Sequence, residues 1–430
     1  MLTVGYVGMT HLGLVSAIAA AAKGSEQGIK IVGYHPDKTD ALKNGQLPVV
    51  EPDLDRLLDE HKEKITFTSD LNDLKACDII YIAPDVPTND RGESDLSPIE
   101  DLVSFIIPCL SASAVVVILS QVHPGFTRSL ENKHALTLKG RLFYQVETLI
   151  FGRAVERALY PERFMVGTKE KNTSLPASLQ KFLSLFECPI FVMSYESAEL
   201  AKISINMYLV STVTTTNMLA EVCEKVGAEW EDIAETLRLD KRIGPYAYLS
   251  PGLGLSGGNL ERDLTTILQI SHNHGNNSQL VQTWLDDHEY RADWALRKLH
   301  EIVLNEKEMP TIAVWGLAYK INTHSIKNSP SLRLLRSLSS FKVNAYDPVV
   351  KHLEGYDHVR ICDNALAACD EADVLIVMTP WDEFKSFKIK DIANNMKNPI
   401  IIDPFPVFEI AEENSNFQHV SLGRPNKFAA

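Results

Sequence analysis

The chain has few cysteines and fewer basic than acidic residues. Each of these shortages argues against a class of protein. The 430 residues contain 6 cysteines, none in a CxxC pair, so the pattern gives no sign of a disulfide scaffold. Lys and Arg number 42 against 56 Asp and Glu, and the formal net charge of −14 argues against nucleic acid or an anionic membrane as a main partner. Reduced thiols are typical of a cytoplasmic protein, which is the location we expect.

The sequence pattern predicts neither a signal peptide nor a membrane span. The first residues, MLTVGYVG, lack a basic start and are typical of a strand. One uncharged run, residues 102–124, is long enough to span a bilayer, but it contains Pro108 and several serines and turns into the β-branched stretch AVVVILS. We interpret it as a helix followed by a strand. The histidine pair His272 and His274 is interpreted as a solvated helix end rather than a metal site.

Strands and helices alternate at both ends of the chain. Near the N-terminus the stretches LTVGYVG, IKIVGYH, DIIYIAP and AVVVILS are apolar strand candidates separated by helical patterns. Near the C-terminus the strand candidates are TIAVWGLAYK, FKVNAYDP, ADVLIVMTP and NPIIIDP. Such alternation is typical of parallel sheets covered by helices on both faces.

Long helical patterns, about 196–235 and 279–304, separate the two alternating regions. The predicted fold class is therefore α/β, with two Rossmann-like doubly wound domains joined by a helical region. We expect an N-terminal dinucleotide-binding domain at 1–195, a central helical region at 196–304 and a C-terminal domain at 305–430.

A dinucleotide-binding turn is indicated after the first strand. Gly8, Thr10 and Gly13, with His11 and Leu12 between the last two, occupy the places of a GxGxxG motif at a helix start. Threonine replaces the middle glycine, whose lack of a side chain normally lets the backbone approach the pyrophosphate.

The acid that normally ends the second strand and binds the ribose is missing as well. The strand ends in GYHPDK, which puts Gly33 or His35 at that place and Asp37 beyond it. NAD is the predicted cofactor. NADP, held through His35 and Lys38, stays open, and so does a Rossmann domain that kept its fold and lost its ligand.

Several stretches together resemble the UDP-glucose/GDP-mannose dehydrogenase family. They occur in the family's order over about residues 1–410, and they are GQLPVVEPDLDRLL, NDRGESDLSPIE, AELAKISINMYL, CEKVGAEWEDIAETLRLDKRIG, GLAYKINTHSIKNSP and AYDP. The resemblance implies an NAD domain, a helical dimerising middle and a nucleotide-sugar domain, and hence a homodimer that takes a UDP-sugar or a related sugar nucleotide. Family enzymes oxidise a primary sugar alcohol to a carboxylate in two hydride transfers, through a cysteine thiohemiacetal and a thioester.

The family's loop G-F-G-G-S-C-F-P-K-D falls on residues 254–263 without a gap, and its cysteine falls on Asn259. A carboxamide nitrogen is not nucleophilic and has no thiolate-like form. The four-electron oxidation to a uronate is therefore not expected of this chain.

Other family positions are retained or lost unevenly. The resemblance assigns catalytic positions to Glu147, Lys202, Asn206, Asn259 and Asp263, and substrate contacts to Arg242, Gly254 and Lys320. It assigns surroundings of the cofactor to Gln121, which replaces a threonine, and to Lys327, which replaces an arginine and loses its bidentate fork. Phe151 stands for a second glutamate and Phe405 for an arginine.

Two hypotheses follow. In the first, the chain is a divergent NAD-dependent oxidoreductase that performs one two-electron step on a sugar nucleotide, because hydride abstraction from an alcohol needs a base and a nicotinamide but no thiol. In the second, it is a catalytically inactive family member that binds a nucleotide or sugar nucleotide, or that pairs with an active homologue. Each assigned residue also has a plain structural interpretation, such as Asp263 near a helix start or Asn259 holding a turn.

Overall fold

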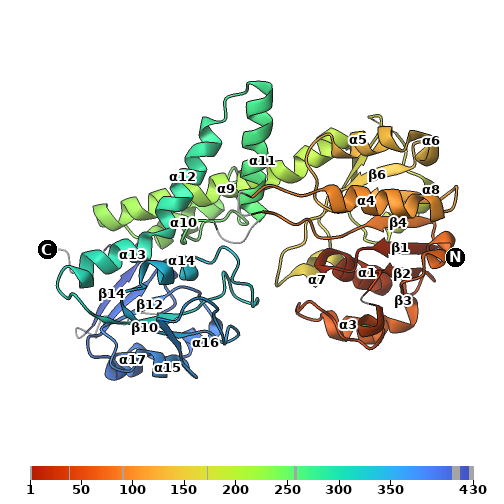
Figure 1. Ribbon diagram of the computed structural model, residues 1–430. Coiled ribbons are helices and arrows are strands. Elements are labelled where there is room, and N and C mark those ends of the chain that lie inside the picture. The colour runs from red at the N-terminus through yellow and green to blue at the C-terminus, as the bar shows by residue number, and fades with distance from the viewer. Residues whose placement is uncertain are drawn as a thin grey trace. The chain divides into compact units, whose positions relative to one another are not determined.

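The computed structural model describes residues 2–37, 39–89, 92–171, 173–255, 259–408 and 417–425. Lys38, one of the two residues on which NADP binding was considered, lies outside these ranges, as do Ser256, Gly257 and Gly258 of the glycine loop. The chain divides into two compact units, Met1–Ile205 and Asn206–Ala430. Figure 1 shows that each unit has a sheet with helices packed around it.

The sheet of the first unit has 8 strands in the order β3-β2-β1-β4-β5-β6-β7-β8. The pairs are parallel except β6 with β7, which is antiparallel. The strands are β1 (Thr3–Val7), β2 (Lys30–Tyr34), β3 (Ile65–Thr68), β4 (Ile79–Ile82), β5 (Val115–Ile118), β6 (Leu142–Gln145), β7 (Phe164–Thr168) and β8 (Ile190–Ser194). The helices are α1 (His11–Gly24), α2 (Thr39–Lys43), α3 (Leu54–His61), α4 (Ser97–Ile106), α5 (Phe126–Lys133), α6 (Ala135–Leu138), α7 (Ala154–Leu159) and α8 (Ala177–Ser184).

Both faces of this sheet are buried, because successive strand residues point to opposite sides. Val4 and Tyr6 of β1 face a core with residues of α1, α3, α7 and α8. Val7 faces a second core, which includes residues of α4 and α5. The first six strands follow the doubly wound order 3-2-1-4-5-6, in which ligands bind where the order reverses, beside β1 and β4.

The second unit contains most of the helical region and a 6-stranded parallel sheet in the order β11-β10-β9-β12-β13-β14, which repeats the doubly wound order. Its strands are β9 (Thr311–Trp315), β10 (Lys342–Tyr346), β11 (Val359–Ile361), β12 (Val374–Val377), β13 (Ile400–Asp403) and β14 (Gln418–Ser421). Helix α9 (Tyr195–Val226), yellow-green in Figure 1, continues into this unit, followed by α10 (Trp230–Leu239), α11 (Asn259–His274), α12 (Gln279–Ala292), α13 (Trp294–Leu299), α14 (Pro330–Ser337), α15 (Ala365–Cys369), α16 (Asp382–Lys385) and α17 (Ile389–Asn395).

The predicted fold class is confirmed: there are two Rossmann-like doubly wound sheets, with helices between them along the chain. The run at 102–124 is a helix followed by a strand, as predicted, and none of the helices in the described ranges combines the length and the apolar character that a bilayer crossing needs. The division at residues 195 and 304 stays a prediction.

Three predicted element bounds are wrong. The helix expected over 196–235 is interrupted by Gly227, which has φ +78° and ends α9. The helix expected over 279–304 breaks at Asp293, and the turns after α13, at 300–304, are π-helical. The strand expected to reach residue 320 ends at Trp315, because Gly316 turns the chain with φ +93°.

Candidate active site

The turn after β1 has the backbone geometry of a dinucleotide site. Gly8 has φ +100°, and a Cβ on it would lie 2.6 Å from the nitrogen of Pro84. A Cβ on Gly13 would lie 1.9 Å from the carbonyl oxygen of Gly8. Both positions therefore require glycine, and the close approach of α1 to the strand directs the first amides of the helix to the carboxyl edge of the sheet.

Thr10 and Asp85 join this turn to the loop after β4. The Thr10 hydroxyl accepts a hydrogen bond from the amide of Asp85 at 2.9 Å and donates to the carbonyl of Ala83 at 3.5 Å. The carboxylate of Asp85 accepts from the amides of His11 at 3.1 Å and Leu12 at 3.4 Å. A carboxylate thus lies at the positive end of α1, which shows that an anion fits there.

Asp85 was not predicted as a site residue from the sequence. The available signal was an acid just beyond the fourth strand candidate, at the edge where the strand order reverses.

The ring of His11 is held between Glu51 and Phe151. Its Nε2 lies 2.8 Å from Oε1 of Glu51, and its ring centre is 4.2 Å from that of Phe151. Glu51 is 5% exposed, and its other oxygen accepts from the amides of Gly152 at 2.9 Å and Ala154 at 3.2 Å. Phe151 therefore contacts a residue of the predicted cofactor turn.

The remaining cofactor candidates of the first unit follow neighbouring strands. His35 comes directly after β2, and its Nδ1 accepts from the amide of Asp37 at 3.0 Å. Gln121 is half-buried in the loop after β5. Because carboxyl ends of parallel strands meet at one edge of a sheet, both residues share that edge with Gly8 and Asp85.

Glu147 and Lys202 come together in the first unit. The Nζ of Lys202 lies 3.9 Å from Oε2 of Glu147, and their side chains are 12% and 17% exposed. The amide of Leu149 also donates to the Glu147 carboxylate, which fixes the loop after β6. An ammonium held this way can stabilise negative charge that develops on a substrate oxygen.

Asn206 and Asp263 come together in the second unit. The Asn206 amide nitrogen donates to Oδ2 of Asp263 at 2.5 Å, and Nε of Arg262 lies 3.5 Å from Oδ1. Asp263 is 1% exposed, whereas Asn259, the first residue of α11, is exposed. Residue 259 thus lies one helical turn before a buried carboxylate.

The described part of the glycine loop is anchored by His288. Gly254 has φ +81°, and the amide of Leu255 donates to Nδ1 of His288 at 2.9 Å. The other ring nitrogen of His288 lies 3.2 Å from Oε1 of Glu261, whose Oε2 accepts from the Asn328 side chain at 2.6 Å. His288 was missed because nothing local in a helical sequence marks a contact 33 residues away.

The predicted substrate-binding cations, Arg242 and Lys320, each contact a residue close to them in the sequence. The Arg242 side chain is 89% exposed and is paired with Asp240, its second neighbour in sequence. The ammonium of Lys320 lies 5.6 Å from the ring centre of Tyr319. Lys327, which was predicted to lie near the cofactor, is exposed.

The amides of the turn after β9 in the second unit are bound by a carboxylate from the end of the neighbouring strand β10. Asp347, fully buried at the end of β10, accepts from the amides of Leu317 at 2.7 Å and Ala318 at 3.1 Å and from the Trp381 indole at 3.1 Å. The following helix, α14, starts only at Pro330. This turn therefore does not offer free amides to a phosphate, although the strand order matches that of the first unit.

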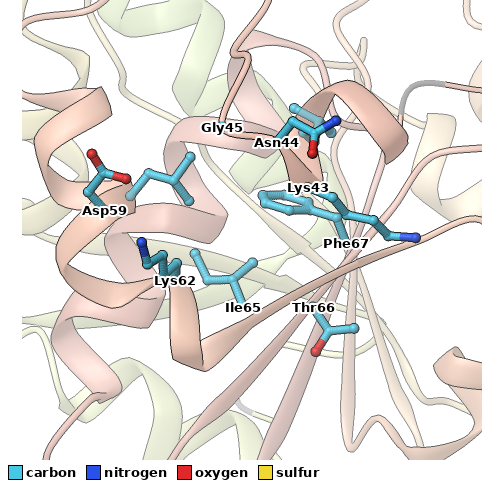
Figure 2. A pocket seen from close by; sticks show the side chains of 10 residues that line it. Lys43, Asn44, Gly45, Asp59, Lys62, Ile65, Thr66 and Phe67 are labelled. Carbon is cyan, nitrogen blue, oxygen red and sulfur yellow. The ribbon is translucent and has the colours of Figure 1, made fainter.

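A hollow of about 420 Å³ lies elsewhere on the first unit, as Figure 2 shows. Lys43, Asp59 and Lys62 contribute to its lining, with Ile65 and Phe67 of β3 among the apolar residues. It borders the end of α2, the end of α3 and the start of β3, which is the amino edge of the sheet. It is therefore separate from the carboxyl edge that carries the cofactor turn.

Comparison with known proteins gives three family matches, which follow one another along the chain. Residues 2–187 match the NAD binding domain of the UDP-glucose/GDP-mannose dehydrogenase family, 196–288 its central domain and 313–410 its UDP binding domain.

Among curated proteins, the chain is 30% identical to UDP-glucose 6-dehydrogenase TuaD of Bacillus subtilis, over 99% of this chain and 94% of that protein. It is 29% identical to the UDP-glucose 6-dehydrogenase of Rhizobium meliloti, over 98% and 99% of the two chains.

Two solved structures share the fold. One is a UDP-glucose dehydrogenase from Pyrobaculum islandicum, with a TM-score of 0.82 and 24% identity over 95% of both chains. The other is a UDP-D-ManNAc dehydrogenase from Pyrococcus horikoshii, with a TM-score of 0.83 and 24% identity over 99% of this chain and 100% of that one.

Proposed function

Because the chain belongs to the UDP-glucose/GDP-mannose dehydrogenase family and has its NAD-binding domain, we propose that it oxidises the alcohol of a UDP-sugar, or of a related sugar nucleotide, in a single two-electron step. The product is an aldehyde or ketone, not a uronate. The observation that carries the proposal is Asn259, the first residue of α11. The resemblance puts the family's cysteine at this position. Asp263 follows one helical turn later.

The proposed step needs a hydride acceptor, a proton acceptor and a group that stabilises the alkoxide. Bound NAD supplies the hydride acceptor. Lys202, held by Glu147, stabilises the substrate oxygen as its proton leaves, and a carboxylate of this chain, Glu147 or Asp263, takes that proton. Carbon loses a hydride and oxygen a proton, so alcohol and NAD yield carbonyl product, NADH and one proton.

The second oxidation has no route through residue 259. The route implied by the family resemblance passes through a covalent adduct from which a hydride can leave to give an acyl intermediate, and a carboxamide forms no such adduct. The retained pairs, Glu147 with Lys202 and Asn206 with Asp263, support the first step alone.

The substrate class is proposed from the UDP-binding match at 313–410 and the cations Arg242 and Lys320. The amides of the β9 turn are taken by Asp347, so side chains have to provide most of the recognition of the nucleotide.

A homodimer is part of the proposal. Apolar side chains stand exposed along the second unit's part of α9 and along α10 and the segment after it, namely Tyr208, Met218, Val222, Val226, Leu239 and Tyr246. Covering such a face is favourable at roughly 25 cal/mol per Å² of apolar surface. All six cysteines are unpaired, which supports a reducing compartment such as the cytoplasm.

The test is the yield of NADH per sugar. Purified protein is incubated with NAD, and in parallel with NADP, against a panel of nucleotide sugars, and the carbonyl product is trapped with a hydrazine. We expect one NADH per sugar and a trapped aldehyde or ketone. Two NADH per sugar, or a carboxylate found by mass spectrometry, would refute the single-step proposal.

An Asn259→Cys variant sharpens this test, because it restores a thiol without altering the neighbouring carboxylate. We expect it to raise the yield toward two NADH per sugar, with a carboxylate product. An Asn259→Ala control should stay at one.

The second candidate function is an inactive member that binds NAD or a nucleotide sugar or pairs with an active homologue. Asp85 at the α1 amides and Phe151 at a family glutamate position favour it, since they alter the cofactor side independently of Asn259. Binding of NAD and a UDP-sugar by calorimetry, with no NADH from any nucleotide sugar, would select this candidate.

A further inference from the structure

The loop after β4 places a negative charge where the cofactor's own negative charge has to bind. In a strand–turn–helix dinucleotide site, the pyrophosphate is bound by the first amides of the helix and by the positive end of its dipole. Here the amides of His11 and Leu12 already donate to the carboxylate of Asp85, at 3.1 and 3.4 Å. The carboxylate and a pyrophosphate would need the same donors, so both cannot be bound at once.

Thr10 takes part in this arrangement. Its hydroxyl accepts from the Asp85 amide at 2.9 Å, so the side chain that replaces the middle glycine holds the loop from which Asp85 reaches back to the helix. Thr10 and Asp85, the two residues that differ from a standard cofactor turn, are thus joined by a hydrogen bond.

The contact of Asp85 is displaceable, in contrast to that of Asp347. Asp85 is exposed, and its two hydrogen bonds are at the long end of the usual range. Asp347 is fully buried and accepts from four amides, those of Leu317, Ala318, Val349 and Val350, and from the Trp381 indole. Asp85 can turn into water at little cost, whereas Asp347 cannot leave without stranding buried donors.

We propose that Asp85 is an affinity-setting residue of the cofactor site: its carboxylate occupies the pyrophosphate position of the free protein and has to leave before NAD binds. The proposal rests on NAD binding by this domain and adds that Asp85 weakens it. The consequence is a lower affinity for NAD than the turn itself would give, and a site that is closed by the protein's own anion whenever the dinucleotide is absent.

The test compares dissociation constants measured by calorimetry on the full chain. Asp85→Asn removes the charge and keeps an acceptor, so we expect NAD to bind about fivefold more tightly. Asp85→Ala removes both the charge and the competing hydrogen bonds, and we expect a gain of about thirtyfold. Asp73→Asn is the matched control, because Asp73 is an exposed acid of the same unit, and it should leave the affinity unchanged.

Ligand fragments separate the pyrophosphate from the rest of the dinucleotide. ADP carries a pyrophosphate and should gain affinity in both Asp85 variants, whereas adenosine carries none and should not. Thermal denaturation in the absence of ligand checks folding, and Asp85→Asn keeps the test valid if the alanine variant is unstable.

Several results would overturn the proposal. They are unchanged or weaker NAD binding in both Asp85 variants, an equal gain for adenosine, an equal gain in Asp73→Asn, or no detectable NAD binding by any variant. The turnover assay is scored separately: if affinity rises as expected while no variant produces NADH, the proposed oxidation fails and the role of Asp85 stands.

Discussion

Glu51 offers the sharpest prediction about how the cofactor turn is supported. Its buried carboxylate accepts hydrogen bonds from the amides of Gly152 and Ala154 and from the ring of His11, and so ties the segment before α3 to the start of α7 and to α1. We consider Glu51→Ala, which removes the acceptor, and Glu51→Gln, which keeps its shape and removes its charge.

The expected loss of folding free energy depends on which buried amides each variant leaves without a hydrogen-bond acceptor. In Glu51→Ala the amide of Ala154, a residue with 0% exposure, loses its partner where water does not reach, at about 1–3 kcal/mol. Loss of the remaining bonds to a charged acceptor and of a side chain that is 5% exposed brings the expected destabilisation to about 3–4 kcal/mol. In Glu51→Gln one oxygen still serves both amides, and about 1–2 kcal/mol is expected.

The effect should depend on pH in a defined direction. Burial by itself would raise the pKa of Glu51, but the hydrogen bonds from His11, Gly152 and Ala154 outweigh it and hold the pKa below its usual 4.5. A lowered pKa contributes stability that is complete above the unfolded value and is lost as the pH falls through the folded one. The difference between wild type and Glu51→Gln should therefore be constant above about pH 5.5 and shrink on further acidification.

The assay has to report on the first unit. All five tryptophans lie between Trp230 and Trp381, in the second unit, so their fluorescence does not follow the unfolding of residues 1–205. Far-UV circular dichroism in urea, together with hydrogen exchange of peptides covering α7, serves this purpose. Glu63→Gln, an exposed glutamate of the same region, is the control and should change stability by less than about 0.5 kcal/mol.

The reasoning is refuted if Glu51→Ala leaves the exchange of α7 amides and the urea midpoint unchanged. It is also refuted if the difference between wild type and Glu51→Gln grows as the pH is lowered, because that is the sign expected of a raised pKa.

Three further predictions test the turn, the glycine loop and the dimer. Gly13→Ala puts a Cβ 1.9 Å from a backbone oxygen and should destabilise the first unit by about 3 kcal/mol and abolish NAD binding, as read by circular dichroism and calorimetry. His288→Ala frees the amide of Leu255 and should speed hydrogen exchange in the glycine loop and lower any turnover, while NAD affinity stays the same. Val222→Asp should convert a homodimer to a monomer in light scattering, whereas Phe105→Asp, which charges another exposed apolar position, should not; a monomeric wild type would contradict the dimer.

The sequence was informative where the physical signal is local. Apolar runs bounded by glycine and proline located β1, β2, β4 and β5 of the first sheet and β9, β10, β12 and β13 of the second, because a buried parallel strand is apolar on both faces. The strands that were missed are β3, β6, β7, β8, β11 and β14. Of these, β3, β8, β11 and β14 are only partly buried, and all of these four but β8 lack a continuous apolar run, whereas β6 and β7 are fully buried. The end of α11 was expected at His274.

The long-range hydrogen bonds that hold the candidate site together could not be predicted from the sequence. Asp85 lies 74 residues from His11, and Glu51 lies 101 residues from Gly152. Such contacts depend on which loops the folded sheet brings to one edge. A single sequence does not contain this spatial arrangement, so the contacts could not be predicted from it. The glycines of the cofactor turn could be located because a motif of fixed spacing reflects backbone geometry. The role of Asn259 rests on the resemblance of its loop to the family's loop and stays a prediction.

The closed turn of the second unit has a consequence for how ligand preference can change. Main-chain amides are the same whatever the residue, so a site that depends on them resists alteration by point substitution. Asp347 already binds the amides of Leu317 and Ala318. Under the proposed function, we expect a nucleotide at the second unit to be recognised mainly by replaceable side chains such as that of Lys320. We therefore expect single substitutions on the surface of this unit to change the preference among sugar nucleotides while its sheet stays intact.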